Sequence, residues 1–124
     1  MAIATLNTKL SIVRPTGQVN ASNTVELDRQ LKSAILSERY STVLVDMQQV
    51  ETLDSAGLRV LVSALRLAQQ RNQRFSICSV GDSVRMIFEL TQLDQAMEIF
   101  ESYDAFLATL AAHEDSPRRT MAYA

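Results

Sequence analysis

Few side chains in this sequence have the chemistry of a catalytic site. Cys78 is the only cysteine and His113 is the only histidine. Cys78 lies in the apolar run 74–80, where a thiol usually acts as a small buried hydrophobic group, and His113 lies near the polar end of the chain. A nucleophilic thiolate needs a base or a cation beside it, so these two residues predict no catalytic pair. The sequence has no glycine-rich phosphate loop and no cluster at metal-ligand spacing, so we expect no enzyme, cofactor or metal.

A carboxylate and a hydroxyl stand side by side at Asp54 and Ser55, directly ahead of a long helical pattern. Side chains of these types accept hydrogen bonds from the unpaired amides at the start of a helix. Taken alone, the pair therefore indicates an ordinary N-cap.

The helix that follows, predicted over residues 56–73, has two stripes. The core stripe consists of Leu58, Leu61, Leu65 and Ala68. The polar stripe consists of Arg59, Ser63, Arg66 and Gln70. The apolar residues between them make the helix more apolar than one buried face requires. The polar stripe is therefore a possible docking face for a partner. The alternative is that Arg59 and Arg66 are ordinary solvated residues.

Length and charge restrict the class of protein further. The chain has 124 residues, which suits one domain. Its 12 basic and 14 acidic side chains give a net charge of −2, which does not favour binding to nucleic acid. The sequence has no apolar run near the roughly 20 residues that span a bilayer and no signal-like start. We therefore expect a cytoplasmic protein, without membrane insertion, that is a monomer when free.

Periodicity divides the chain into alternating strands and helices. Strands are expected at residues 2–6, 8–14, 42–46, 75–80 and 96–100, and helices at 24–37, 56–73, 84–90 and 102–112. Residues 15–17 should end the second strand, and 47–53 should be a connection. Cys78, Met86 and Met97 fall at apolar positions and are expected to fill the core.

The order β-β-α-β-α-β-α-β-α predicts a fold of the α/β class. Alternating strands and helices imply crossover connections and a mostly parallel sheet, and the first hairpin adds an antiparallel edge. The expected architecture is a single open sandwich over residues 1–112 with about four helices. Residues 113–124 are polar and contain a proline, so we expect a flexible C-terminal tail.

Three segments in order resemble the landmarks of the STAS family. The most informative is the buried strand 43–46 followed by Asp54-Ser55-Ala56-Gly57-Leu58, which is similar to the family's Asp-Ser-x-Gly-Leu signature. The others are the turn 17–20 and the late strand and helix 75–93. The resemblance spans residues 10–110, and it implies a STAS-like fold similar to bacterial anti-sigma factor antagonists.

What the resemblance implies is a partner-switching regulator of transcription. In such signal transduction, the unphosphorylated antagonist binds an anti-sigma factor or related serine kinase, that kinase phosphorylates the motif serine, and a serine phosphatase restores it. Ser55 matches that serine. The free amides and the dipole of the helix start can solvate a phosphate there, and its added charge would weaken partner binding. Any ATP and Mg²⁺ would belong to the kinase.

The partner-binding residues expected on this basis are Asn20, Asp54, Ser55, Ala56, Gly57, Leu58, Arg59 and Arg66. Gly57 would allow close backbone approach by a partner. Asn20 departs from the aspartate that the family often has in this turn, so it is either a partner contact with altered preference or an ordinary turn residue.

The rival hypothesis is a constitutive STAS scaffold or ligand-sensing subunit of a transporter or signalling complex. In that case Ser55 is not phosphorylated and only caps its helix. The fold by itself does not separate the two hypotheses.

Overall fold

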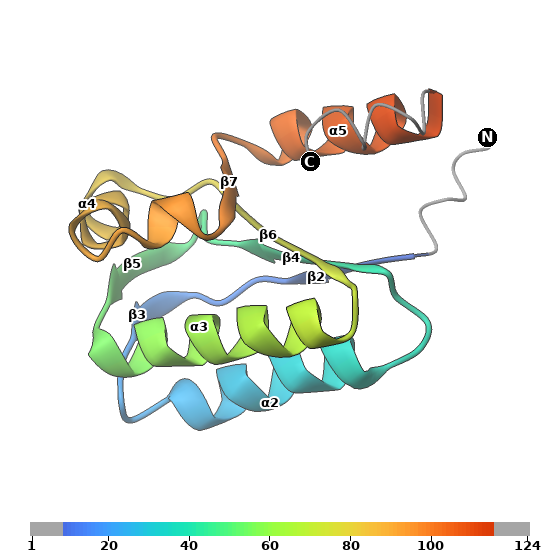
Figure 1. Cartoon of the computed structure of the whole chain (residues 1–124). Helices are drawn as coiled ribbons and strands as arrows, with labels where there is room; N and C mark the ends of the chain where they lie inside the picture. The colour runs from blue at the N-terminus through green and yellow to red at the C-terminus, as the bar shows by residue number, and fades with distance from the viewer. Residues whose placement is uncertain (1–8, 116–124) are drawn as a thin grey trace.

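Strands and helices alternate along the chain as the sequence predicts (Figure 1). The computed structural model describes residues 9–115. Its strands are β2 (Leu10–Val13), β3 (Gly17–Val19), β4 (Thr42–Asp46), β5 (Val50–Leu53), β6 (Arg74–Cys78) and β7 (Glu98–Phe100). Its helices are α2 (Thr24–Leu36), α3 (Ser55–Gln70), α4 (Asp82–Leu90) and α5 (Tyr103–Asp115), with a 3₁₀ turn at Leu93–Gln95. The fold class is α/β, as predicted.

Four of the strands form one parallel sheet in the order β2-β4-β6-β7. Its register pairs Val13 with Val45 and Asp46 with Cys78, so the carboxyl ends of these strands lie along one edge. Parallel neighbours need crossover connections, and α2, α3 and α4 lie within them. β4 is buried along its whole length, as a central strand covered on both faces should be.

Helices cover both faces of this sheet. α2 and α3 lie side by side on one face, and α5 lies on the other (Figure 1). Side chains alternate along a strand, so Val43 and Val45 of β4 belong to the cluster under α2 and α3. Leu44 instead packs with Cys78 and Phe106 under α5. The expected burial of Cys78 is confirmed, since none of its surface is exposed.

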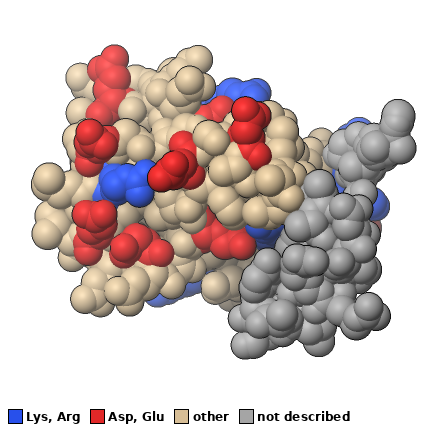
Figure 2. Space-filling view, turned by 90° about the horizontal axis from the view of Figure 1, so that it is seen from above, with Lys and Arg blue, Asp and Glu red and all other residues tan. Residues whose placement is uncertain are grey.

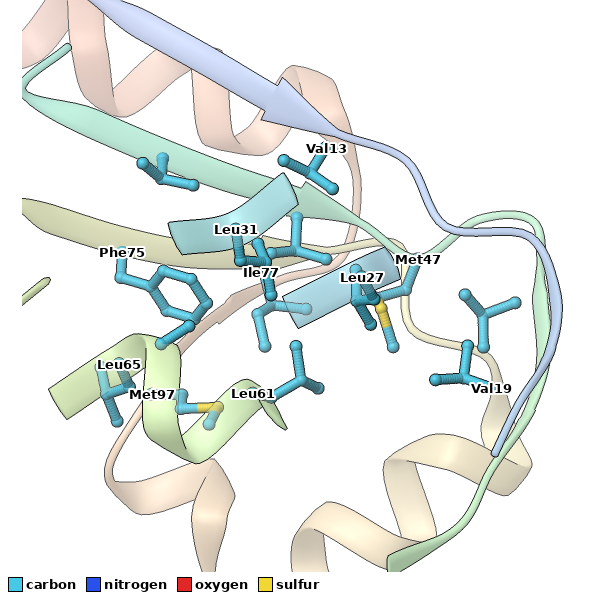
Figure 3. Close-up of a cluster of buried hydrophobic side chains, with 14 of the residues drawn as sticks. Val13, Val19, Leu27, Leu31, Met47, Leu61, Leu65, Phe75, Ile77 and Met97 are labelled. Atoms are coloured by element: carbon cyan, nitrogen blue, oxygen red, sulfur yellow. The ribbon is translucent and has the colours of Figure 1, made fainter. Parts of the chain in front are cut away.

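The larger cluster joins the sheet to α2 and α3 (Figure 3). Leu31 of α2, Leu61 of α3 and Ile77 of β6 are fully buried in it. The same cluster reaches Val19 of β3, so one continuous core holds both the main sheet and the small strands beside the start of α3.

The sequence pattern does not predict β3 and β5. β5 falls in the expected connection 47–53, and β3 begins where residues 15–17 were expected to end a strand. The two strands pair with each other in parallel. Each has three or four residues, too few for a periodic pattern, so their pairing across more than 30 residues of chain decides their structure.

The predicted hairpin and tail fall partly outside the described residues. Residues 1–8, which include its first strand, and residues 116–124 are not described. All strand pairs among residues 9–115 are parallel, including that of β2 with β4. α5 runs to Asp115, so the first three residues of the predicted tail are helical.

One methionine prediction is wrong. Met97 is buried, as expected, but Met86 is 59% exposed. The buried face of α4 is formed by Val84 and Phe88, four residues apart, and Met86 lies on the opposite face. A nine-residue helix offers too few positions for the pattern alone to show which apolar stripe is buried.

Candidate functional site

The candidate site is the turn from β5 into α3. Asp54 is the N-cap of α3: its backbone is extended, and its Oδ1 accepts a hydrogen bond of 3.0 Å from the Gly57 amide. Ser55 is the first residue of the helix. The capping role that the sequence offers to the pair therefore belongs to Asp54.

Ser55 has no structural task in this turn. It is exposed, and its hydroxyl makes no hydrogen bond with another residue of the described range 9–115. The first amides of a helix have no partner within the helix and carry the positive end of its dipole. The hydroxyl therefore stands on the surface beside groups that favour a negative charge.

Asp54 also ties the start of α3 to the loop after β3. Its Oδ2 accepts a 3.3 Å hydrogen bond from the Ala21 amide, and its own amide donates to the Val19 carbonyl at 3.1 Å. One carboxylate thus spans two segments that are far apart in the sequence. Nothing in the sequence marks the Ala21 backbone as a contact, because only the pairing of β3 with β5 brings it there.

Asn20 organises the same loop from within. Its Oδ1 accepts hydrogen bonds from the Ser22 amide at 2.9 Å and the Ser22 hydroxyl at 2.6 Å. Its own amide donates to the Asn23 side chain at 3.0 Å. Asn23 flanks the start of α2 without capping it through its side chain. Asn20 therefore has the turn role that the sequence allows, at a half-buried position next to the site.

Gly57 is buried, and the close backbone approach that it permits is to its own chain. A Cβ at this position would lie 2.5 Å from Leu53 Cδ1 and 2.8 Å from Val19 Cγ1. The first turn of α3 therefore packs directly on β3 and β5. Ala56 and Leu58 on either side are half-buried, and Leu58 packs against the core as the sequence predicts.

Arg59 and Arg66 lie exposed on the outer side of α3. Arg59 lines a hollow of about 280 Å³ with Ala56 and Ser63 of α3 and with Thr24 and Asp28 of α2. The structure thus brings most predicted site residues to the first two turns of α3. Arg66 lies seven residues further along, about 10 Å by the helix rise.

The other reactive groups lie away from this turn. Burial raises the pKa of the Cys78 thiol, which keeps it protonated and poorly nucleophilic. Nearby at the end of β4, the buried Asp46 pairs with Arg14 at 3.1 Å. Within residues 9–115 no three His, Cys, Asp or Glu side chains are placed to hold a metal ion.

None of the helices in the described part of the chain has the length and apolarity that are needed to cross a bilayer.

Comparison with known proteins points to one family. The model of the STAS domain matches residues 2–106 of this chain. The anti-sigma-B factor antagonist of Staphylococcus aureus (strain NCTC 8325) is 26% identical over 97 residues, which cover 78% of this chain and 89% of that protein.

Solved structures agree on the fold. An anti-sigma factor antagonist from Mycobacterium paratuberculosis superposes with a TM-score of 0.74 at 20% identity, covering 83% of this chain and 86% of the other. The phosphorylated form of the Bacillus cell fate determinant SpoIIAA superposes with a TM-score of 0.65 at 15% identity, covering 82% of this chain and 92% of the other. A sulfate transporter family protein from Wolinella succinogenes superposes with a TM-score of 0.73 at 16% identity, covering 87% of this chain and 89% of the other. At these identities the likeness concerns the fold alone, whereas the family-model match over residues 2–106 establishes that the chain belongs to the STAS domain family.

Proposed function

We propose that this protein is an anti-sigma factor antagonist that works by partner switching in the cytoplasm. In its unmodified form it binds an anti-sigma factor or related serine kinase through the start of α3 and the loop before α2. Phosphorylation of Ser55 by that kinase ends the interaction, and a serine phosphatase restores it. The chain binds rather than catalyses, and ATP belongs to the kinase.

The observation that supports this proposal most directly is that Asp54 and Ser55 have different structural roles. Asp54 caps α3 and holds the loop at Ala21. Ser55 is exposed and its hydroxyl is not used by the described residues around it. A phosphoryl group can therefore be added without breaking a bond that holds the fold.

The charge of a phosphoserine would change this surface strongly. It adds about −1.5 to −2 charges at neutral pH, directly beside the exposed carboxylate of Asp54. The amides at the helix start would favour the phosphate within the protein. A partner surface that fits the neutral hydroxyl would meet like charge and a desolvation cost, so the modification should lower its affinity.

The relatives support the same role. The name of the Staphylococcus aureus relative describes an antagonist of an anti-sigma factor, and SpoIIAA has been solved in a phosphorylated form. Transferring partner choice and phosphorylation to this chain is part of the proposal.

The experiment is to incubate the purified protein with ATP and a lysate of its source cells and to map phosphate by mass spectrometry. We expect phosphate on Ser55 that is lost in Ser55→Ala. The matched control is Ser33→Ala, which removes another exposed serine, in the last turn of α2, and should leave the modification unchanged. An active lysate that leaves Ser55 unmodified would contradict the proposal.

A constitutive STAS module of a transporter is the second candidate, favoured by the structural likeness to the Wolinella succinogenes protein. This function gives Ser55 no regulatory role. Partner binding that is equally strong in Ser55→Ala and Ser55→Asp would favour it over the switch.

A further inference from the structure

A groove runs along the outer side of the molecule between α2 and α3. It encloses about 390 Å³ and is lined by Lys32 of α2 and by Arg59, Val62, Arg66 and Leu67 of α3. We call it the α2–α3 groove. α2 and α3 lie side by side over its length (Figure 1), and sequence reasoning identified only its α3 side.

The groove is positively charged. Three of its lining side chains are cationic, and none of its lining side chains is a carboxylate. Lys32 pairs with Asp28 at 3.2 Å, but neither Arg59 nor Arg66 forms an ion pair with another residue of the described range. Two guanidinium groups are therefore available to a ligand.

The floor of the groove is apolar. Val62 and Leu67 are half-buried and pack against the core from the outer side of α3. Each leaves part of an aliphatic side chain open to the groove. A ligand that fits must therefore combine carboxylates with apolar side chains, as an acidic amphipathic helix does.

The groove continues to the candidate site. The hollow at the start of α3 shares Arg59 and Ser63 with it and is also lined by Ala56. Ser55 lies four residues before Arg59, which places the two on the same face of the helix. A ligand in the groove would thus end within one helical turn of Ser55.

Charge elsewhere on the molecule narrows the choice of occupant. On the left side of the face seen in Figure 2, acidic side chains lie around a basic patch. Between Asp82 and Asp104 the chain has six Asp or Glu residues and Arg85 as the only basic residue. This acidic side and the net charge of −2 disfavour a long polyanion such as nucleic acid. A short acidic protein segment needs only the groove.

We propose that the α2–α3 groove binds an acidic amphipathic segment of the partner protein. Carboxylates of the segment pair with Arg59 and Arg66, and its apolar side chains cover Val62 and Leu67. The span from Arg59 to Gln70 is about 16 Å, so the segment is a helix of about three turns. This inference rests on the proposed function and assigns a partner chemistry to it.

The groove also explains how a phosphate at Ser55 would act over a distance. A negative group four residues before an arginine is the favourable orientation of a helical ion pair. Phosphoserine 55 would therefore attract Arg59 away from the partner and repel the partner's carboxylates. Both effects lower the affinity for an acidic segment.

The test uses the full chain, ¹⁵N-labelled, and a blocked acidic peptide of about 14 residues, which is about four helical turns. The peptide has glutamates seven residues apart and leucines between them. We expect amide shifts confined to residues 59–70 and the 32–36 end of α2. Arg59→Glu and Arg66→Glu should each weaken binding about tenfold or more, because they place like charges together.

The matched control is Arg85→Glu, a charge reversal at an arginine of α4 that lies outside the groove lining. It should change the affinity by less than about twofold, because Arg85 is on a different element and does not line the groove. Thermal melts of all three variants show whether each one is folded. A peptide with lysine in place of glutamate should not bind.

The outcomes separate this inference from the proposed function. Peptide affinity that is equal in Arg66→Glu and Arg85→Glu would overturn the groove, even if Ser55 is phosphorylated in lysate. If the peptide binds through the two arginines but the lysate leaves Ser55 unmodified, the groove is supported and the switch is contradicted. Self-association that is lost in Arg66→Glu would identify a second copy as the occupant and overturn the partner segment.

Discussion

At the scale of single residues, Asp54 stabilises the turn at the candidate site, whereas the hydroxyl of Ser55 is exposed and open to modification. The two oxygens of Asp54 accept hydrogen bonds from Gly57 and Ala21. Ser55 points a hydroxyl into solvent from the first position of α3. Residue type alone does not separate these roles, because aspartate and serine are equally good N-caps.

Replacing Asp54 with alanine should therefore destabilise the protein, whereas replacing Ser55 should not. We expect Asp54→Ala to lower the free energy of unfolding by about 1–2 kcal/mol, the upper part of the range for a lost N-cap, since it also frees the Ala21 amide. Ser55→Ala should stay within about 0.5 kcal/mol, as for other exposed positions. Urea denaturation measures both, and an equal loss in the two variants would contradict the assignment of the cap.

Gly57 should not tolerate a side chain. A methyl group there would meet Leu53 and Val19 at 2.5 and 2.8 Å, so Gly57→Ala should cost about 1–3 kcal/mol of stability, as overpacking does. Gly81→Ala is the matched control, because a Cβ there has no atom within 4 Å. Thermal or urea unfolding checks both variants. If Gly57→Ala is no less stable than Gly81→Ala, the tight packing of α3 on β3 and β5 is wrong.

Cys78 should react slowly in the native protein. Burial raises the pKa of its thiol, and none of its surface is exposed. Because the folded protein keeps this thiol protonated more strongly than the unfolded chain does, its protonation favours the folded state. This stabilisation is complete below the ordinary thiol pKa of about 8.5 and is lost as the pH rises beyond it. We expect labelling by a thiol reagent at pH 8 to be slow in buffer and fast in denaturant. Rapid native labelling would contradict the burial.

At the scale of elements, two short strands and a helix start hold one another. β3 and β5 pair over only three positions, and a two-stranded sheet is marginal by itself. Its stability comes from Val19 and Leu53 in the core and from the Asp54 bridge to the loop after β3. The candidate site is thus built on a junction of elements that no single segment specifies.

The two faces of α4 provide a test at this scale. Phe88 is fully buried, and Met86 is 59% exposed two residues earlier. We expect Phe88→Ala to cost about 3–5 kcal/mol by leaving a cavity. Met86→Lys should change stability by less than about 0.5 kcal/mol. Chemical denaturation of both variants measures this difference, and a large loss in Met86→Lys would mean that α4 is turned differently from the structure.

At the scale of the whole molecule, charge is segregated although the net charge is small. α3 has arginines and no acidic residue, whereas residues 82–104 are strongly acidic. Opposite charges on different faces can orient a partner before contact. Association of the proposed complex should therefore depend on salt in a way that the stability of the fold does not.

Binding of a purified anti-sigma factor from the same organism should respond to both charge and salt. We expect Ser55→Asp to weaken it about tenfold or more and Ser55→Ala to preserve it, because only the former adds a negative charge at the surface. Affinity should also fall when salt is raised from about 0.05 to 0.5 M, since screening shortens the reach of Arg59 and Arg66. Calorimetric titration measures both effects. Salt-independent binding with equal affinity in the two variants would contradict the switch.

The sequence by itself determined the α/β order, the amphipathic helices and the position of the Asp-Ser pair. These are local properties: periodicity over 10 to 16 residues identifies a helix, and an apolar run such as residues 43–45 identifies a central strand. Three segments in order, the turn 17–20, the motif 54–58 and the segment 75–93, were enough to indicate the family that the family-model match then established.

Only the tertiary structure decided which of the pair caps α3, that β3 and β5 are strands, and that Lys32 joins two arginines of α3 in one groove. The strand pair and the groove join residues that are tens of positions apart in the chain, and the capping Asp54 is itself held by the Ala21 amide 33 residues away. Such contacts leave no periodic signal in a short segment, because their energy comes from the partner segment and not from the segment's own pattern.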